Sequence, residues 1–282
     1  MRSSACISMC LYSVGVLATK FVVMDALINA SINNSNFGLT GLRALVTGGG
    51  SGIGRAIADA MINAGATVVV CDVNDSTKPN YICDVSKTND VEAMFAAIER
   101  DLGGLDILVN NVGVPGPTAR VDEMDPDAYD ECVRINLGGT FRCTHVAVPM
   151  LLKSKGSIIN ISTSAGIYGY PLRSPYVAAK WGIIGLTKSW AMELGEFGVR
   201  VNAICPGSVS GPRMDGVIER EALATGSTAS EIRTGYEKQV SLQTFVDASD
   251  IAASAVFLSS PAARFITGQV LPVDGNIETM RA

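Results

Sequence analysis

The sequence predicts an α/β fold, a single doubly wound domain in which helices flank a parallel sheet of about seven strands. Short apolar runs alternate with segments of helical periodicity along most of the chain, as is typical of a parallel sheet covered on both faces. No internal repeat and no Pro/Ser-rich linker divides the chain, which favours one domain. Hydrophobic residues make up 48% of the 282 residues and charged residues 17%, which excludes a disordered chain.

The first half of the domain begins with clear strand and helix segments. Residues 42–46 (Leu-Arg-Ala-Leu-Val) form an apolar run, and glycines and a helix-period segment at 53–64 follow directly. Residues 67–71 (Thr-Val-Val-Val-Cys) are mostly β-branched and predict a buried strand. A third short strand is expected at 81–83, and apolar residues three and four apart predict a helix at 90–102.

The same alternation continues to the end of the chain. Apolar runs and periodic segments predict, in order, strand 107–109, helix 127–152, strand 157–161, helix 175–194, strand 199–204, helix 247–258 and strand 269–273. The segment at 210–244 is longer than a simple connection and contains two helical pieces, around 217–224 and 229–240. We therefore expect an insertion after the strand at 199–204.

Charge and composition exclude several classes of function. The 22 Lys and Arg residues against 27 Asp and Glu give a formal charge of −5, which favours neither nucleic acid nor an anionic membrane as a partner. His145 is the single histidine and is expected to be an ordinary helix residue, so a metal site and a Ser-His-Asp triad are disfavoured. The seven cysteines form no Cys-x-x-Cys pair and indicate buried residues of a cytoplasmic protein: Cys6, Cys10, Cys71, Cys83, Cys132, Cys143 and Cys205.

Residues 1–40 differ from the rest, and we expect the folded domain to cover 41–282. Polar residues interrupt the apolar stretch at 7–23, and no clear cleavage site follows it, unlike in a signal peptide. The segment is expected to be a poorly ordered extension, or the result of a start codon assigned too early, with Met24 as the other candidate start. A role in membrane targeting is the remaining alternative.

The segment after the first strand predicts a nucleotide-binding loop of the Rossmann type. It reads Thr47-Gly48-Gly49-Gly50-Ser51-Gly52-Ile53-Gly54. Glycines let main-chain N–H groups approach a pyrophosphate, and the helix N-terminus favours its negative charge. Asp72 closes the next strand and can accept hydrogen bonds from the adenosine ribose, whereas no Lys or Arg lies in the loop or directly after Asp72. The sequence therefore predicts NAD rather than NADP as the cofactor.

A tyrosine and a lysine four residues apart form the predicted reacting centre. Ser174 is suited to an N-cap and Pro175 to the first helical position, so Tyr176 and Lys180 lie on one helix face. An ammonium about 5 Å from the phenol oxygen contributes roughly 3 kcal/mol at an effective dielectric constant of about 20. We expect Lys180 to lower the pKa of Tyr176 by about 2 units, which makes the phenol a usable acid or base. An ordinary helix surface is the alternative for the pair taken alone.

Several motifs, in order along the chain, give it a resemblance to the short-chain dehydrogenase/reductase family over about residues 40–276. The motifs are the glycine loop, Asp84-Val85, Asn110-Asn111-Val112-Gly113 with Val112 in place of the usual alanine, Asn136, Tyr176-x-x-x-Lys180 and Pro206-Gly207-Ser208-Val209. The resemblance implies hydride transfer between a nicotinamide ring and a substrate carbon. It implies cofactor contacts from Thr47, Gly48, Ser51, Gly52, Ile53, Gly54, Asp72, Asp84, Val85, Asn110, Val112, Gly113, Ile161, Tyr176, Lys180, Pro206, Gly207 and Val209.

The resemblance also implies roles at the reacting centre. Tyr176 exchanges a proton with the substrate oxygen, Lys180 holds the nicotinamide ribose, and Asn136 positions a relay water. The family's substrate-orienting serine corresponds to Thr163, which offers the same hydroxyl, with Ser164 as the alternative. The implied protein is an NAD(H)-dependent enzyme that interconverts a secondary alcohol and a ketone. A 3-oxoacyl-thioester reductase and a regulatory protein without turnover are the alternatives.

In this family the segment at 210–244 corresponds to a lid over the substrate. Its charges are expected on a solvated helix face, and Arg213 can alternatively meet an anionic group of the substrate. Residues 168–172 are expected to line the substrate pocket. The resemblance further implies a homotetramer with the helix at 175–194 and the last strand at its interfaces.

Overall fold

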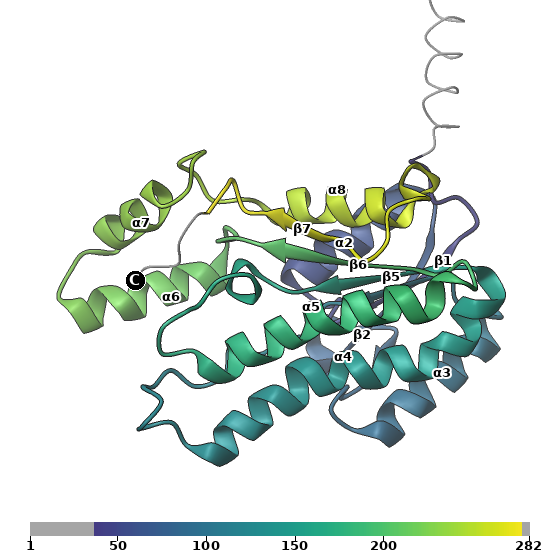
Figure 1. Cartoon of the computed structure of the whole chain (residues 1–282), viewed down its shortest axis with the longest axis horizontal. Coiled ribbons are helices and arrows are strands. Elements are labelled where there is room, and N and C mark those ends of the chain that lie inside the picture. Colours follow the sequence, from purple (N-terminus) through teal and green to yellow (C-terminus); the bar gives the residue numbers. More distant parts are fainter. Residues whose placement is uncertain (1–36, 278–282) are drawn as a thin grey trace, which may run out of the picture. The chain divides into compact units, whose positions relative to one another are not determined.

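The computed structural model of the chain describes residues 37–277 (Figure 1). A compact unit begins at Leu39, and it contains one sheet of seven strands in the order β3-β2-β1-β4-β5-β6-β7, with every pairing parallel. The predicted α/β fold is thus confirmed. The predictions for residues 1–36, with the alternative start at Met24 and with Cys6 and Cys10, lie outside the described residues, as do residues 278–282.

The strands and helices follow the predicted order. The strands are β1 (Arg43–Thr47), β2 (Thr67–Asp72), β3 (Tyr81–Ile82), β4 (Ile107–Asn110), β5 (Ser157–Ile161), β6 (Arg200–Pro206) and β7 (Val270–Val273). The helices are α2 (Gly52–Asn63), α3 (Thr88–Leu102), α4 (Pro126–Ser154), α5 (Ser174–Gly195), α6 (Pro212–Thr225), α7 (Ala229–Lys238) and α8 (Ala248–Ser259). Helix α6 begins five residues before the expected 217, because a proline at the first helical position is already suited to start a helix.

The strand order reverses between β1 and β4, and this reversal positions the site. Strands β2 and β3 lie on one side of β1, whereas β4 to β7 lie on the other. In open parallel sheets, ligands bind outside the carboxyl ends of the strands at such a switch point. The glycine loop after β1 and the residues after β4 meet there. Figure 1 shows α6 and α7 beyond the carboxyl ends of β6 and β7, at the same edge of the sheet.

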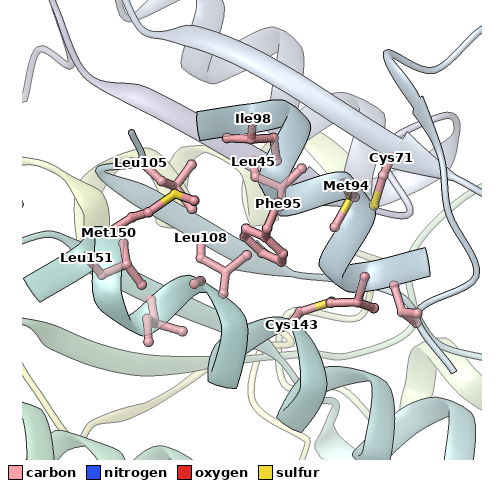
Figure 2. Close-up of a cluster of buried hydrophobic side chains, with 14 of the residues drawn as sticks. Leu45, Cys71, Met94, Phe95, Ile98, Leu105, Leu108, Cys143, Met150 and Leu151 are labelled. Atoms are coloured by element: carbon pink, nitrogen blue, oxygen red, sulfur yellow. The ribbon is translucent and has the colours of Figure 1, made fainter. Parts of the chain in front are cut away.

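Two hydrophobic clusters hold the helices against the sheet. Helices α2 and α8 cover one face, and α3, α4 and α5 cover the other (Figure 1). Alternating residues of β1 serve both clusters: Leu45 faces α3 and α4, while Ala44 and Val46 face α2 and α8. Figure 2 shows the first cluster, with the Phe95 ring among Leu45, Leu108 and Met94. Both faces of the sheet are therefore covered by apolar side chains, which explains why its strands are continuous apolar runs in the sequence.

Three further features bear on the sequence predictions. The cysteines of the described part are all buried free thiols, as expected, at Cys71, Cys83, Cys132, Cys143 and Cys205. His145 lies on an exposed face of α4 and stacks on Phe141, with ring centroids 5.9 Å apart. Within residues 37–277, no helix has both the length and the apolar character needed to cross a membrane, and no three His, Cys, Asp or Glu side chains come together as metal ligands.

Candidate active site

The glycine loop (residues 47–54) is folded tightly between β1 and α2. Gly48 and Gly52 have φ angles of 61° and 55°, in the left-handed region that favours glycine. A Cβ atom at Gly54 would overlap the Gly48 carbonyl oxygen and the Asn111 side chain, whereas one at Gly52 would meet nothing within 4 Å. The loop therefore leaves open space at the N-terminus of α2, where main-chain N–H groups suit a phosphate.

Hydrogen bonds join this loop to the segment after β4. The Thr47 hydroxyl accepts the N–H groups of Asn111 (3.0 Å) and Val112 (3.3 Å). In return, Asn111 Nδ2 donates to the carbonyls of Thr47 (3.0 Å) and Gly48 (3.1 Å). The two loops at the switch point are thus tied to each other. Val112 and Gly113 remain only partly buried, so a ligand can reach both.

Asp72 lies beside the glycine loop at the end of β2. Its Oδ2 accepts the Gly50 N–H at 3.2 Å, and its Oδ1 accepts the Asn74 N–H at 3.1 Å. The carboxylate is therefore oriented by the main chain and stays partly exposed. A Cβ atom at Gly50 would overlap the Thr77 side chain and would lie 2.8 Å from Asp72 Oδ2. This crowding requires glycine at position 50.

Asp84 and Val85 follow β3 and differ in exposure. The Asp84 carboxylate accepts the Ser86 hydroxyl at 2.6 Å and the Ser86 N–H at 3.0 Å, and these hydrogen bonds lower its pKa. Val85 is buried, and a Cβ atom at Gly139 of α4 would lie 2.7 Å from its Cγ2. Asp84 is accessible to a ligand, whereas the Val85 side chain belongs to the core.

The side chain of Asn110 points into the sheet instead of toward the glycine loop. Its Nδ2 donates to Asn160 Oδ1 (2.9 Å) and to the Thr144 hydroxyl (3.0 Å). Asn160 Nδ2 in turn donates to the Thr187 hydroxyl at 2.9 Å. This series of buried hydrogen bonds connects α4, β4, β5 and α5. The cofactor contact that the resemblance implies for Asn110 would therefore come from its main chain. Its Oδ1 is buried without a partner in the described part of the chain.

Lys180 is 3% exposed, and its ammonium lies at the carboxyl ends of the central strands. Nζ donates to the Ile161 carbonyl at 2.9 Å and lies 5.8 Å from the centroid of the Tyr176 ring. A Cβ atom at Gly113 would be 3.3 Å from this Nζ and 3.0 Å from Asn136 Oδ1. Burial, assisted by the charge of Arg213, lowers the pKa of Lys180 to about 8.

Asn136 of α4 is fully buried and joins that helix to the loop after β4. Its Oδ1 accepts the Val114 N–H at 3.1 Å, while Nδ2 donates to the carbonyls of Val114 (3.1 Å) and Cys132 (2.8 Å). The Asn136 main-chain carbonyl accepts the Thr140 hydroxyl at 2.9 Å. The side-chain amide therefore has its partners within the protein, and it fixes the wall of the site next to Lys180.

Tyr176 is half-buried in the first turn of α5, and its pKa is raised, contrary to the expectation from the sequence. Burial raises the pKa of Tyr176, whereas the charges of Arg213 and Arg173 and a side-chain hydrogen bond with Thr163 lower it. The prediction that Lys180 lowers this pKa was wrong for the structure as it stands. Its ammonium faces the phenol ring and donates to a carbonyl, and the two arginines supply the cationic charge that acts on the hydroxyl.

The start of α5 also differs from the prediction. The N-cap position is Arg173, and Ser174 is already helical and accepts no capping hydrogen bond. The preceding Leu172 has a φ of 64°, which turns the chain so that Arg173 lies against Tyr170 and Tyr176. Its guanidinium carbon is 5.7 Å and 5.3 Å from the centroids of these two rings. Sequence reasoning missed Arg173, although a cation three residues before Tyr176 was a usable signal.

The two hydroxyl candidates before Tyr176 point in different directions. Ser164 is 1% exposed, and its hydroxyl donates to Asp274 Oδ2 (3.1 Å) and to the Pro206 carbonyl (3.2 Å). Thr163 is partly exposed, and its hydroxyl donates to the Pro206 carbonyl at 3.3 Å. It also lies close enough to the Tyr176 hydroxyl to act on the pKa of that group. The structure thus brings Thr163, and not Ser164, to the phenol.

The segment after β6 closes the site on the side of α6. The Gly207 N–H donates to the Val273 carbonyl at 3.0 Å, and a Cβ atom at Gly207 would lie 2.7 Å from Asp274 Cβ. Val209 pairs with Val246 in an isolated parallel bridge. The chain therefore leaves the sheet at Pro206 and returns beside Val209. Residues 210–244, which the resemblance implies to be a lid and which we call the lid below, lie between these two points.

The lid helices are joined to each other and to the loop before α5. Arg233 of α7 pairs with Asp215 of α6 at 2.7 Å. The Tyr236 hydroxyl of α7 donates to Glu221 Oε2 of α6 at 2.8 Å. Burial and hydrogen bonding with Tyr170 and Glu221 raise the pKa of Tyr236. Of the residues expected to line the pocket, Tyr170 thus contacts the lid.

Comparison with known proteins places this geometry in one class, the nicotinamide-dependent oxidoreductases. A family model described as enoyl-(acyl carrier protein) reductase matches residues 48–276. D-beta-hydroxybutyrate dehydrogenase of Cupriavidus necator is 38% identical over 254 residues, which cover 84% of this chain and 98% of that protein. The 3-oxoacyl-(acyl-carrier-protein) reductase of Thermotoga maritima is 32% identical over 254 residues, covering 85% and 98%.

A solved structure agrees with these relatives. The NAD+-bound xylitol dehydrogenase superposes with a TM-score of 0.79 at 28% identity, over 84% of this chain and 99% of that one. The chain therefore belongs to the short-chain dehydrogenase/reductase family, and it is an oxidoreductase that acts on CH–OH groups and the corresponding carbonyls.

Proposed function

We propose that this chain is an NAD(H)-dependent dehydrogenase that interconverts a secondary alcohol and a ketone, with Tyr176 as the proton acceptor and donor. The observation that carries the proposal is the convergence of Thr163, Tyr176 and Lys180 beside the glycine loop. The Thr163 hydroxyl lies close enough to the phenol to act on its pKa, and Lys180 lies against the phenol ring and next to Gly113. A substrate hydroxyl between Thr163 and Tyr176 would thus lie near Lys180 and Gly113, at the edge of the sheet that also carries the glycine loop.

The protein's own groups supply the proton chemistry and the orientation. When bound, the nicotinamide cofactor accepts the hydride from the carbinol carbon in oxidation and returns it in reduction. Tyr176 takes the hydroxyl proton in oxidation, Thr163 orients the substrate oxygen, and Asn136 holds the wall beside Lys180. Ser164 supports the loop through Asp274. The cofactor would be held by the glycine loop, Asp72, Asp84, Val112, Gly113, Ile161, Lys180, Pro206, Gly207 and Val209.

Asp72 supports NAD as the cofactor. Its carboxylate is held by the N–H groups of Gly50 and Asn74, in a position suited to accept ribose hydroxyls. A 2′-phosphate there would meet this negative charge, with Thr77 packed against Gly50 on the same side. Arg55, the cation that directly follows the glycine loop, already pairs with Asp59 at 2.9 Å.

A 3-oxoacyl-thioester reductase is the second candidate. The Thermotoga maritima relative favours it. The description of the family model shares the acyl carrier protein with this candidate but names a different reaction, the reduction of an enoyl group. Asp72 argues against this candidate. Reductases of this kind normally use the phosphorylated cofactor, whose 2′-phosphate the Asp72 carboxylate would repel.

The test is a kinetic comparison of NAD and NADP with a panel of cyclic alcohols, polyols, hydroxycarboxylates and acyl thioesters. We expect kcat/KM for NAD to exceed that for NADP at least tenfold, a discrimination of about 1.4 kcal/mol. A tenfold preference for NADP together with turnover of acyl thioesters alone would support the second candidate instead.

The assembly and the location are part of the same proposal. We infer a cytoplasmic homotetramer whose catalytic domain covers residues 41–282. Trp181 of α5 is half exposed, as an interface residue would be, whereas Ile184 and Trp190 are buried within the domain. Light scattering that gives the mass of a single 29.5 kDa chain would contradict the tetramer.

A further inference from the structure

Two cations, Arg173 and Lys180, lie against the Tyr176 ring, and the charge of a third, Arg213, acts on the Tyr176 hydroxyl. Lys180 donates to a main-chain carbonyl, and Arg173 donates to the Pro115 carbonyl at 2.7 Å. Within residues 37–277, neither of these side chains nor Arg213 forms an ion pair. Since the chain as a whole carries a charge of −5, this local excess of positive charge is a property of the site.

The Arg173 guanidinium has an N–H group without a hydrogen-bond partner in the described part of the chain. Its guanidinium lies between the rings of Tyr170 and Tyr176, 5.7 Å and 5.3 Å from their centroids. One terminal nitrogen is used by Pro115, while Nε is buried and has no partner. A buried N–H of a charged group without an acceptor is costly. Because this Nε is enclosed by protein, the terminal nitrogens of the partly exposed guanidinium are the part that a carboxylate can reach.

Arg213 is the second residue of α6. Its charge acts on both Tyr176 and Lys180. Two acidic residues of α6 have other partners, since Asp215 pairs with Arg233 and Glu221 accepts the Tyr236 hydroxyl. Arg213 itself is exposed and stays available.

We propose that the alcohol oxidised by this enzyme carries a carboxylate close to its carbinol carbon, and that Arg173 and Arg213 bind that carboxylate. Arginine pairs with carboxylates through parallel N–H···O bonds. An arginine against the Tyr176 ring and a second whose charge acts on the same phenol fit a short hydroxycarboxylate. The inference rests on the proposed function. In the reaction the carbinol C–H bond gives a hydride to the cofactor and the O–H proton goes to Tyr176, while the carboxylate is unchanged.

The first experiment compares substrates of equal shape and different charge. With the full-length protein and NAD, we measure kcat/KM for 3-hydroxybutyrate, for its neutral amide, and for neutral alcohols such as cyclohexanol and xylitol. We expect the carboxylate to be preferred over its amide at least tenfold. Acetate should inhibit competitively against 3-hydroxybutyrate, and more strongly than inorganic phosphate.

The second experiment assigns the preference to the two arginines. Arg173→Gln and Arg213→Gln should each reduce the preference for carboxylate over amide at least fivefold, and Arg213→Lys should retain part of it. Arg100→Gln is the matched control, because Arg100 is an exposed residue at the end of α3 that pairs with Asp101. The affinity for NAD, followed by quenching of protein fluorescence, should remain within twofold of the wild type in the arginine variants.

The outcomes separate this inference from the proposed function. Turnover of neutral alcohols without a preference for the carboxylate overturns the inference and leaves the proposed function intact. Loss of NAD affinity in Arg213→Gln, with the carboxylate preference unchanged, overturns the role of Arg213. Stronger inhibition by phosphate than by acetate overturns the choice of a carboxylate. If no alcohol of either charge is oxidised, the proposed function itself fails.

Discussion

The two sides of the candidate site are held in place in different ways. The cofactor side, which we define as residues 47–54, residues 110–113, Asn136 and Lys180, is fixed by hydrogen bonds among largely buried groups. In the lid, α6 and α7 are joined by side chains that remain partly exposed, Arg233 with Asp215 and Tyr236 with Glu221, and main-chain hydrogen bonds from Ser241 and Leu242 hold its end. The proposed chemistry is therefore built on buried hydrogen bonds, and the proposed substrate access on a segment whose two helices are joined by partly exposed polar groups.

The difference in burial determines how each side responds to substitution. An exposed ion pair contributes about 0–1 kcal/mol, so a single change in the lid has a small effect. Removing one partner of a buried hydrogen bond costs about 1–3 kcal/mol, because the other group stays unsatisfied. Substitutions on the cofactor side and at Tyr176 should therefore give the largest changes.

The largest effect is expected for Tyr176→Phe, which removes the hydroxyl that we propose exchanges the proton. General acid–base catalysis contributes roughly 10²- to 10⁴-fold, and we expect kcat to fall by about 10³-fold. The affinity for NAD, measured by fluorescence quenching, should be almost unchanged because the ring is retained. A variant with more than a tenth of the wild-type kcat would show that another group carries the proton.

Lys180→Met separates catalysis from stability on the cofactor side. We expect kcat to fall by about 10²-fold, because Lys180 lies against the phenol ring and beside the implied position of the nicotinamide ribose. We also expect a more stable protein at pH 7. The pKa of Lys180 is about 8 in the folded protein against an ordinary 10.5, and this difference corresponds to about 3 kcal/mol. Loss of the hydrogen bond to Ile161 offsets about 1–3 kcal/mol of the gain.

The pH dependence of the free energy of unfolding provides a control for the prediction on Lys180→Met. Between pH 8 and 10.5 the unfolded chain still binds the Lys180 proton and the folded protein does not, so wild-type stability rises with pH relative to the variant. The advantage of Lys180→Met is thus greatest below pH 8 and shrinks toward pH 10.5. Urea unfolding without cofactor at pH 7 and pH 10 measures the difference. An advantage that is the same at both pH values would contradict the lowered pKa of Lys180.

Thr163→Ala and Ser164→Ala test which hydroxyl orients the substrate. We expect Thr163→Ala to lower kcat by about 10- to 100-fold with little change in stability, because its hydroxyl lies at the partly exposed face of the loop, close enough to Tyr176 to act on its pKa. Ser164→Ala removes a buried partner of Asp274 and should instead lower the melting temperature by several degrees. Comparing kcat with thermal unfolding in both variants is decisive, and the reverse pattern would reassign the role to Ser164.

The same division explains what the sequence could predict. Apolar runs and helical spacing are local signals, so the order of the elements followed from them, and the motif positions followed from the strand ends. The choice between Thr163 and Ser164 depended on which hydroxyl Asp274 holds, a contact 110 residues away in sequence. The pKa of Tyr176 depended on burial and on two arginines from different elements. Neither is a local property of the chain.

Errors at single positions have equally specific causes. Ser174 suits an N-cap by residue type, but the turn at Leu172 advances the helix start and gives the N-cap position to Arg173. Asn110 matches a cofactor motif, yet its side chain joins the series of buried hydrogen bonds through Asn160. In both cases a tertiary contact, and not the residue type alone, determines the position of the side chain and its hydrogen-bond partners.

The smallest effect is expected in the lid, for Tyr236→Phe. The variant removes the hydroxyl that donates to Glu221 and hydrogen-bonds with Tyr170, so α7 loses its connection to the loop before Tyr176. One such hydrogen bond is worth about 1 kcal/mol, and we expect KM for the substrate to rise about fivefold with kcat and NAD affinity nearly unchanged. Tyr81→Phe is the matched control, because it removes a tyrosine–carboxylate hydrogen bond of 3.1 Å to Asp101 away from the site. If both variants raise KM equally, or if Tyr236→Phe lowers kcat as strongly as Thr163→Ala, the lid is not the loosely held side and the contrast between the two halves of the site is wrong.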